Sequence, residues 1–247
     1  MSFGDYSTAL VTGASSGIGA GLVERLAREG LKVHAIGRRR DRLAELSART
    51  GCEVHAIDVR DTEALRDAVA HLPIDVLVNN AGINRPGSIR ESTENDLDAL
   101  VDVGLGAVLQ LTRMMIPGMT ARNRGHIVNI GSIAGLYSFP GHAAYHATKA
   151  GVHALCQQLR LDLHGTRVRV TEVCPGRTAT EIFATTLGDE AEARRRFLDG
   201  FATLQVADVV DSIAYAIAAP WHVNISLMEI WPTYQVPGGL RFAQPAD

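Results

Sequence analysis

The chain has 247 residues, of which 46% are hydrophobic and 21% charged, and its formal net charge at pH 7 is −3. This composition is that of a globular protein rather than a disordered one. The near-neutral charge gives no reason to expect nucleic acid or an anionic membrane as a partner. The sequence shows neither an apolar run of ~18 residues nor the basic and apolar regions of a signal peptide at its start. We therefore expect one cytoplasmic domain over residues 1–247.

The cysteines and histidines predict no metal site. Cys52, Cys156 and Cys174 are odd in number, far apart and outside any metal-ligand spacing. The nine histidines, His34 and His55 among them, mostly lie in predicted strand or helix interiors, again without such spacing. We expect buried free thiols in a reducing compartment.

Short apolar segments rich in Val and Ile alternate with longer amphipathic segments. The first group, each member a predicted strand, comprises residues 8–13, 32–37, 53–58, 75–80, 126–131, 167–174 and 227–231. The second group, each member a predicted helix, comprises residues 19–30, 41–50, 62–72, 93–115, 146–165 and 206–219. Strands apolar on both faces that alternate with helices predict a doubly wound α/β fold. Residues 177–205 lack a clear periodicity, which is typical of a lid or binding loop.

The segment TGASSGIG, residues 12–19, follows the first predicted strand and begins the first predicted helix. Glycines at positions 13, 17 and 19 allow a tight turn whose backbone N–H groups can approach a pyrophosphate at the helix N-terminus. The spacing is G-x-x-x-G-x-G rather than the commoner G-x-G-x-x-G. The strand–turn–helix context favours a dinucleotide site over a glycine-rich turn without a ligand.

The segment after the second predicted strand bears on the choice between NAD and NADP. A carboxylate there would bind the adenosine ribose of NAD, whereas a guanidinium favours the 2′-phosphate of NADP. No acidic residue occurs from Leu31 to Arg40, whereas Arg38, Arg39 and Arg40 are adjacent. We expect NADP(H), with NAD(H) as the less favoured alternative and Arg40 in solvent.

Two further strand ends carry polar residues. Asp58 ends the third predicted strand, where it can accept a hydrogen bond from the adenine amino group. The sequence NNAG, residues 79–82, ends the fourth, where small residues and amides can contact a cofactor or brace the sheet. Each of these short patterns, taken alone, is weak evidence for a cofactor site.

Tyr145 and Lys149 lie four residues apart in the segment GHAAYHATKAG, so that on a helix they share one face. Two unit charges about 4 Å apart at an effective dielectric of about 20 interact by roughly 4 kcal/mol, or about three pKa units. We therefore expect the ammonium to lower the pKa of Tyr145 from about 10 to near 7, suited to proton transfer with an alcohol. Ser132, just beyond the fifth predicted strand, can hydrogen-bond the same substrate oxygen. The alternative is a Tyr–Lys pair on the surface.

The segments TGASSGIG, NNAG and YHATK, together with Ser132 and the Pro175–Gly176 pair, occur in an order that resembles the short-chain dehydrogenase/reductase family over essentially the whole chain. The resemblance implies a single Rossmann-type domain with seven parallel strands in the order 3-2-1-4-5-6-7. It implies Ser132, Tyr145 and Lys149 as catalytic residues, with Tyr145 as general acid/base and Lys149 also holding the nicotinamide ribose. It implies NADP(H) contacts from Gly13, Ser15, Ser16, Gly17, Ile18, Gly19, Arg38, Arg39, Asp58, Val59, Asn80, Ala81, Gly82, Tyr145, Lys149, Pro175, Gly176, Thr178 and Thr180.

Two further implications come from the same resemblance. The segment HVNISLMEIWPTYQ, residues 222–235, is similar to the branch that contains NADP-dependent 3-hydroxy acid and serine dehydrogenases. In the family, the long helices corresponding to residues 93–115 and 145–164 pair between subunits, so a homotetramer or homodimer is expected.

One position departs from the family pattern. Family members usually carry an asparagine where the segment DVGLGAV has Gly104, and its side chain helps to hold a water that continues the proton path from the lysine. Glycine supplies no side chain and weakens a helix by about 1 kcal/mol. A further water, or a polar neighbour such as His126 or Asn129, can take that role; otherwise the enzyme is slow or inactive. We favour activity because the other three catalytic positions are intact.

The substrate is expected to contact loops at the same edge of the sheet. Arg85 and Arg177 favour a carboxylate or another small anion, unless each faces solvent or cofactor phosphate. The sequence therefore predicts an NADP(H)-dependent oxidoreductase acting on a small carbonyl or secondary alcohol, with hydroxy acids among the candidates. The alternatives are an NADP-binding sensor or scaffold on the same fold, and an NAD-preferring alcohol dehydrogenase. The candidate substrate contacts are Arg85, Tyr137, Phe139, His142 and Arg177.

Overall fold

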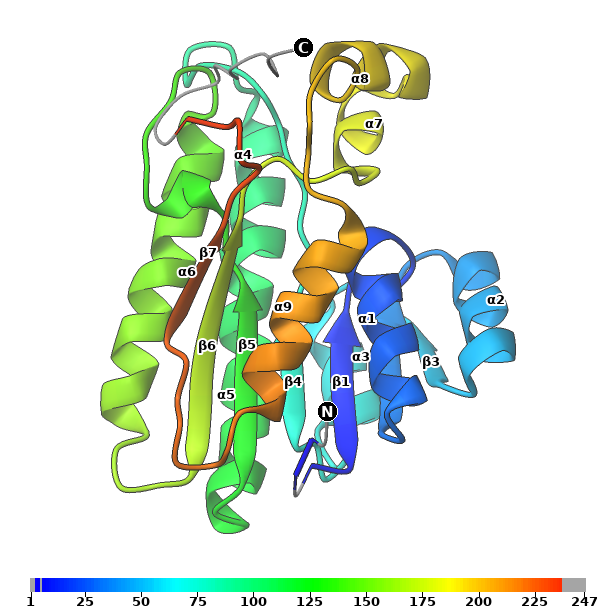
Figure 1. Ribbon diagram of the computed structural model, residues 1–247, viewed down its shortest axis with the longest axis vertical. Helices are drawn as coiled ribbons and strands as arrows, with labels where there is room; N and C mark the ends of the chain where they lie inside the picture. The colour runs from blue at the N-terminus through cyan, green and yellow to red at the C-terminus, as the bar shows by residue number, and fades with distance from the viewer. Residues whose placement is uncertain (1–2, 5, 237–247) are drawn as a thin grey trace.

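The computed structural model describes residues 3–4 and 6–236, and its centre is one parallel sheet (Figure 1). The strands stand in the order β3-β2-β1-β4-β5-β6-β7, and every neighbouring pair is parallel. This confirms the predicted fold class and strand order. The strands are β1 (Thr8–Thr12), β2 (Lys32–Gly37), β3 (Glu53–Ala56), β4 (Val76–Asn79), β5 (Gly125–Ile130), β6 (Val168–Pro175) and β7 (Leu227–Ile230).

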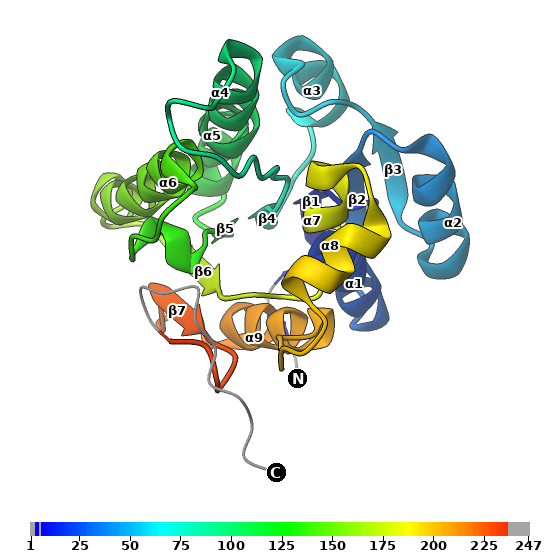
Figure 2. The ribbon, with the colours of Figure 1, turned by 90° about the horizontal axis from the view of Figure 1, so that it is seen from above.

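Helices cover both faces of the sheet, and each face has its own apolar core (Figure 2). One face packs against α1 (Gly17–Arg28), α2 (Arg40–Thr50) and α9 (Val206–Ala218). The other face packs against α3 (Thr62–Val69), α5 (Ala107–Ala121) and α6 (Ala143–Asp162). Strands buried between two layers of helices need apolar side chains on both faces, which is the pattern that the sequence shows.

The helix that leads into α5 is continuous from Glu94 to Ala121. It comprises α4 (Glu94–Val101), one π-helical turn (Asp102–Gly106) and α5. By length and composition alone this stretch could cross a membrane, but 44% of its most apolar window is buried inside the molecule. Its inward side chains, such as Leu111 and Met119, belong to the core. A buried core helix has the same composition, so the length and composition of this helix are weak evidence that it spans a membrane.

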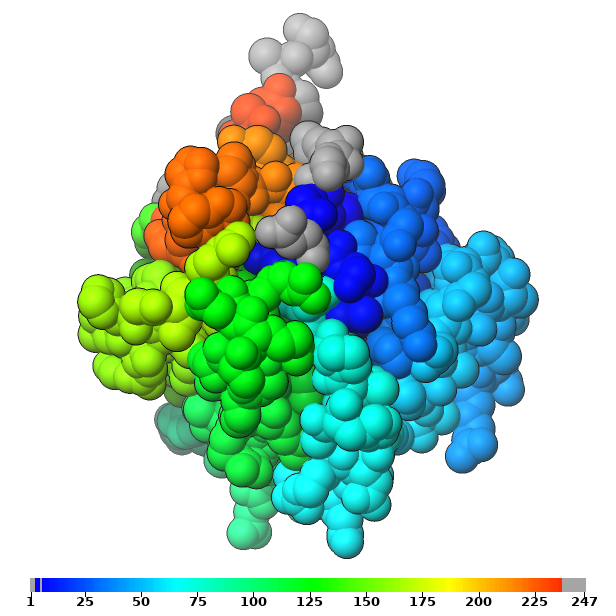
Figure 3. Space-filling model, turned by 90° about the horizontal axis from the view of Figure 1, so that it is seen from below, coloured from blue at the N-terminus to red at the C-terminus, as the bar shows by residue number. Residues whose placement is uncertain are grey.

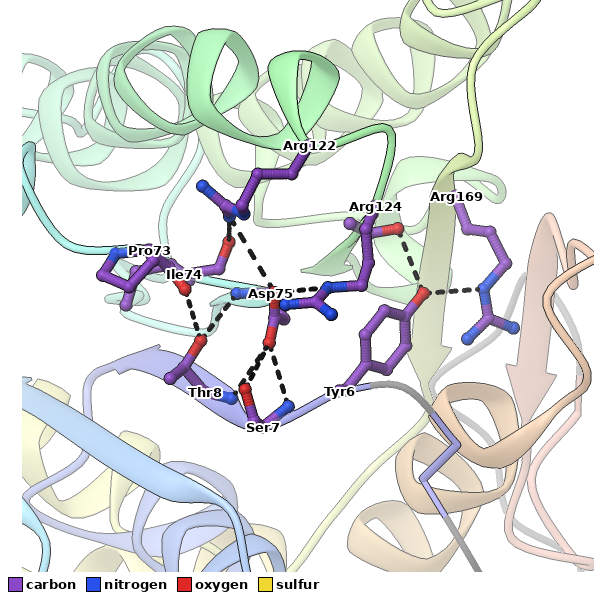
Figure 4. Close-up of polar contacts among 10 residues, drawn as sticks. Tyr6, Ser7, Thr8, Pro73, Ile74, Asp75, Arg122, Arg124 and Arg169 are labelled. Atoms are coloured by element: carbon purple, nitrogen blue, oxygen red, sulfur yellow. Dashed lines mark hydrogen bonds and ion pairs between the residues drawn. The ribbon is translucent and has the colours of Figure 1, made fainter.

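The amino-terminal ends of the strands are tied together by Asp75, which is fully buried (Figure 4). Its Oδ2 accepts hydrogen bonds from the backbone N–H and the hydroxyl of Ser7, both at 2.9 Å, and from the N–H of Thr8 at 3.3 Å. Its Oδ1 accepts from Nε of Arg124 at 3.0 Å. One carboxylate thus joins the chain before β1 to the loop between α5 and β5. Seen from below, the first part of the chain (blue to cyan) and the later part (green to orange) meet over this end (Figure 3).

The opposite end, where the strands finish, carries the segment predicted as a lid. Residues 177–205 contain α7 (Ile182–Leu187) and α8 (Glu190–Phe197), which lie beyond the carboxyl ends of the strands (Figure 1). A parallel bridge between Thr178 and Leu204 closes the base of this segment. That the segment moves as a lid remains a prediction.

Candidate active site

A cleft of about 1070 Å³ lies at the carboxyl ends of the strands, the edge at which open α/β sheets bind their ligands. It is bordered by the loops after β1 to β6 and by α7 and α8. Ser132 lines it, and so do all the predicted cofactor contacts except Gly19: Gly13, Ser15, Ser16, Gly17, Ile18, Arg38, Arg39, Asp58, Val59, Asn80, Ala81, Gly82, Tyr145, Lys149, Pro175, Gly176, Thr178 and Thr180.

Each glycine of the loop after β1 is required for its own physical reason. Gly13 and Gly17 have φ angles of +67° and +53°, a region that side chains disfavour. A Cβ on Gly13 would also stand 2.8 Å from Nδ2 of Asn80. Gly19 lies outside the cleft, where a Cβ would stand 2.4 Å from the carbonyl oxygen of Gly13, so it serves the close packing of α1 on β1. Ser16 precedes α1 without capping it, so no side chain competes with a ligand for the first N–H groups.

Arginines border this loop on the side of β2. Arg39 donates from Nε to Oγ of Ser15 at 3.1 Å and from Nη2 to Oγ of Ser16 at 2.5 Å. The side chain of Arg38 is 64% exposed, with Nη1 4.0 Å from Oδ2 of Asp58. Two guanidinium groups and two hydroxyls therefore gather after β2, the segment for which the sequence predicts contacts with a 2′-phosphate.

Asp58 lines the cleft, but its carboxylate is already engaged. Arg60 donates to it from the backbone N–H, from Nε and from Nη2, at 3.0, 3.1 and 2.8 Å. These bonds lower the pKa of Asp58 below its usual value. A contact with adenine therefore has to share this carboxylate with Arg60.

A carboxylate of the predicted lid segment forms ion pairs with arginines that follow β2. Glu181, the residue before α7, accepts from Nη1 of Arg39 at 2.9 Å and from Nη1 of Arg42 at 2.6 Å. This ion-pair network was not expected from the sequence, because the charges are about 140 positions apart. It fixes the start of α7 against the loop after β2.

Ser132, Tyr145 and Lys149 come together at the end of β5. Ser132 follows the strand in extended conformation, and its Oγ accepts from the N–H of Ala134 at 3.1 Å and also hydrogen-bonds Tyr145. Tyr145 and Lys149 project from one face of α6. Nζ of Lys149 donates to the carbonyl oxygen of Ile130 at 2.7 Å and lies 5.9 Å from the centroid of the Tyr145 ring.

The pKa of Tyr145 differs from the value expected from the sequence. Burial raises the pKa of Tyr145 above its usual value, although the hydrogen bond from Ser132 acts to lower it. Burial also lowers the pKa of Lys149, to about 8. The predicted lowering of the tyrosine pKa by the lysine is therefore not found, because the ammonium points to Ile130 and because desolvation penalises both charged forms.

Gly104 lies in the π-helical turn, and a Cβ there would stand 3.1 Å from Cγ2 of Thr148. The two polar neighbours suggested by the sequence are bonded elsewhere. His126 shares a 2.8 Å hydrogen bond with Thr171, and Asn129 accepts from Asn79 at 2.8 Å. Within the part of the chain that the structure describes, neither side chain hydrogen-bonds Lys149 or the turn, so the structure assigns neither as a replacement for the missing asparagine.

A buried acid near Lys149 was missed from the sequence. Glu172 in β6 is 1% exposed, and its Oε2 lies 2.6 Å from Nδ1 of His153 on α6. Its charge acts against the desolvation of Lys149 by raising the lysine pKa. The signal available in the sequence was an acidic residue inside an otherwise apolar strand.

The predicted substrate residues separate into two groups. Arg85, Phe139, His142 and Arg177 line the cleft, whereas Tyr137 is not among its lining residues. The Tyr137 hydroxyl instead donates to Glu229 at 2.9 Å, and the charge of Arg85 is balanced by Asp96 at 2.9 Å.

The cleft also contains side chains from the aperiodic segment that sequence reasoning did not select. Phe183 and Phe197 stack with centroids 4.5 Å apart. The guanidinium of Arg177 lies 5.0 Å from the centroid of Phe201, and Arg196 also lines the cleft. Several aromatic and basic residues in an otherwise aperiodic stretch were the only available signal. This part of the cleft offers apolar surface beside positive charge.

Comparison with known proteins agrees with this geometry. The family model for short chain dehydrogenases matches residues 7–191. An uncharacterized short-chain type dehydrogenase/reductase of Sinorhizobium fredii (strain NBRC 101917 / NGR234) is 39% identical over 240 residues, covering 97% of this chain and 96% of that protein. The NADP-dependent 3-hydroxy acid dehydrogenase of Escherichia coli (strain K12) is 38% identical over 243 residues, covering 94% and 97%.

A solved structure described as the closed form of serine dehydrogenase complexed with NADP+ superposes with a TM-score of 0.90. It is 37% identical to this chain, and the match covers 96% of this chain and 100% of the other. The chain therefore belongs to the short-chain dehydrogenase family, as its motifs indicated, and is an oxidoreductase by family.

Proposed function

We propose that this protein is an NADP(H)-dependent oxidoreductase that interconverts a small 3-oxo acid and the corresponding 3-hydroxy acid. The observation that carries the proposal is the meeting of Ser132, Tyr145 and Lys149 beside a glycine cradle in one cleft. The relatives described as acting on 3-hydroxy acids and serine support the substrate class.

The residues fit a dinucleotide with a 2′-phosphate. Gly13 and Gly17 leave room for the pyrophosphate, and the first turn of α1 offers N–H groups to it. Arg38, Arg39 and the Ser15 hydroxyl would hold the 2′-phosphate. When bound, the nicotinamide supplies the hydride that reduces the substrate carbon or accepts it in the reverse direction.

The chain's own residues handle the proton and the orientation. Because burial raises its pKa, Tyr145 stays protonated at neutral pH and can donate its proton to the substrate oxygen during reduction. Ser132, hydrogen-bonded to Tyr145, holds that oxygen in place. Lys149 as an ammonium would bind the nicotinamide ribose, and α7 and α8 would limit access of water.

The substrate carboxylate is assigned to Arg177. This guanidinium is partly buried, lines the cleft and lies against the Phe201 ring, a setting that strengthens an ion pair. Arg196 adds positive charge from α8. Arg85 is the weaker candidate because Asp96 already balances its charge.

Gly104 favours a second candidate function, an NADP-binding sensor or scaffold with a lapsed proton path. This candidate predicts tight NADPH binding without turnover. Preference for NAD would be a third possibility, and it predicts a higher kcat/KM with NADH than with NADPH. A cytoplasmic location and a homotetramer or homodimer remain part of the proposal by family resemblance.

The test is to follow NADPH absorbance against 3-oxo acids, 2-oxo acids, aldehydes with carboxylate or sulfonate tails, and neutral ketones. We expect consumption with 3-oxo acids first, with a kcat/KM for NADPH at least tenfold above that for NADH. Consumption only with neutral ketones would overturn the substrate class. Binding of NADPH without consumption of any compound would favour the sensor.

A further inference from the structure

A second group of reactive side chains lies outside the cleft, on the edge of the sheet. His34 belongs to β2, and Glu53 and His55 belong to the neighbouring edge strand β3. In the register of these strands His34 pairs with Glu53 and Ile36 pairs with His55. Among residues 3–4 and 6–236, this is the one group of three or more potential metal ligands whose donor atoms all lie within 4.8 Å of one another.

Two of the three distances between donor atoms lie close to the edges of a tetrahedral metal site, and the third is within 4.8 Å. Nδ1 of His34 lies 3.2 Å from Nε2 of His55 and 3.3 Å from Oε2 of Glu53. A metal with ligand bonds of about 2.0–2.1 Å has tetrahedral ligand edges of roughly 3.3–3.4 Å. The two imidazole nitrogens face each other at hydrogen-bond distance, and rotation of the rings would direct both lone pairs at one ion.

A basic neighbour positions the carboxylate of the group. Lys32 donates to the other carboxylate oxygen of Glu53 at 2.7 Å, which leaves Oε2 for the ion and fixes the carboxylate as an outer partner would.

We propose that His34, Glu53 and His55 bind a divalent transition-metal ion of the Zn²⁺ type, with water completing the coordination. Two imidazoles and a carboxylate form a donor set that such ions favour. One of the two facing nitrogens, Nδ1 of His34 or Nε2 of His55, carries the proton of their hydrogen bond. When the metal binds, this proton moves to the other nitrogen of the same imidazole ring, so both rings remain neutral. The proposal departs from the expectation of no metal and does not depend on the oxidoreductase activity.

The site would act as a clamp on an exposed edge of the sheet. His34 is 2% exposed, whereas Glu53 is exposed and reachable from solvent, so the ion can enter from the side of β3. The clamp would join β3 to β2, the two strands whose ends lead to Asp58 and Arg38. An ion that binds only the folded chain raises its stability by mass action.

The experiment is a calorimetric titration of tag-free protein with ZnCl₂, with Co²⁺ absorption as a second readout. We expect one equivalent to bind wild-type protein. Zn²⁺ about a hundredfold above its Kd should raise Tm by about 5–10 °C. His55→Ala and Glu53→Gln should each weaken binding by roughly tenfold or more. His164→Ala removes an exposed histidine on the far side of the fold and should bind as wild type does.

Each possible result decides the proposal. Glu53→Gln keeps the shape of an exposed side chain, so it remains a test if His55→Ala does not fold. The Co²⁺ spectrum should lack a thiolate charge-transfer band, because Cys52, although next to Glu53 in the sequence, packs in the apolar core with α1 and α2, and Cys156 and Cys174 lie in α6 and β6. Unchanged affinity in a folded His55→Ala or Glu53→Gln variant, or no stoichiometric binding by wild-type protein, would overturn the site. Such a result would leave His34 and His55 as a hydrogen-bonded pair only.

Discussion

Lys149 provides a prediction at the scale of one residue, because burial lowers its pKa to about 8. Below that pH the side chain is an ammonium that can donate to the nicotinamide ribose, and above it the charge is lost. NADPH affinity should therefore fall as pH rises, by up to about tenfold between pH 7 and about pH 9. A fluorescence titration of NADPH across this range measures the fall.

The matched control is Lys149→Met, which has no proton to lose. Its NADPH affinity should be weaker than that of wild type at pH 7 and should change little up to about pH 9. A wild-type affinity that stays flat over the same range would show that the ammonium does not bind the cofactor.

Arg177 carries the prediction on substrate class. Arg177→Met removes the guanidinium that we assign to the substrate carboxylate, and a charged hydrogen bond contributes about 1.5–3 kcal/mol. We expect KM for a 3-oxo acid to rise by roughly ten- to a hundredfold, while KM for a neutral ketone of similar size stays within about twofold. Steady-state kinetics with both compounds measure the difference.

Arg85→Met serves as the comparison, because Asp96 already pairs with Arg85. Its KM for the 3-oxo acid should rise much less than in Arg177→Met. Equal losses for acid and ketone in Arg177→Met would mean that the side chain shapes the cleft without binding the carboxylate.

The order of the motifs along the chain and the family resemblance selected Ser132, Tyr145 and Lys149, because the Tyr–Lys spacing alone also fits a surface pair. The structure brings the three residues to one cleft, and their catalytic role stays a prediction. Their protonation was not predictable, since it depends on burial that a sequence does not display. The same limit explains why Tyr137 was wrongly placed in the substrate site: its hydroxyl bonds to Glu229, which is 92 residues away in the sequence. The pair His34–His55 was missed because a 21-residue separation hides a contact between parallel strands.

At the scale of secondary-structure elements, Asp75 holds β1, β4 and the loop before β5 together. Asp75→Asn preserves the size of the side chain but replaces one acceptor oxygen by a donor NH₂ group, which leaves buried donors unsatisfied. We expect the free energy of unfolding to fall by about 2–3 kcal/mol. Urea denaturation followed by circular dichroism measures this loss.

Asp67→Asn is the matched control, since Asp67 is exposed on α3. Its free energy of unfolding should stay within about 0.5 kcal/mol of wild type. If Asp75→Asn were as stable as this control, the carboxylate would not be what joins these elements.

Element positions followed closely from hydrophobic patterning. Each of the seven strands was predicted within two residues of its observed ends, because strands buried on both faces read as short apolar runs. The π-helical turn at Asp102–Gly106 and the short helix α7 were not predicted. A π turn differs from an α turn by one residue in its hydrogen bonds, and a six-residue helix is too short for a clear repeat.

At the scale of the whole molecule, several apolar side chains of the long helices remain exposed. Val101 and Leu109 lie on α4 and α5, and Leu161 on α6 is 70% exposed. Because the corresponding helices pair between subunits in this family, we expect these residues to be covered by a second copy. Light scattering coupled to gel filtration should give a mass that is two or four times 26.5 kDa.

Placing a carboxylate in that contact should separate the subunits. Leu109→Glu combined with Leu161→Glu should shift the mass towards one chain, because a buried unpaired charge disfavours association. A wild-type mass of one chain would contradict the assembly. An unchanged multimer in the double variant would move the contact to another face.

The central claim is that Tyr145 supplies the proton in an NADPH-dependent reduction. The most direct test measures NADPH binding and NADPH consumption side by side in wild type and in Tyr145→Phe, with the best 3-oxo acid from the panel. We predict that the variant binds NADPH within about threefold of wild type and loses more than nine-tenths of the turnover. A variant that binds NADPH normally and keeps more than a tenth of the rate would contradict the account.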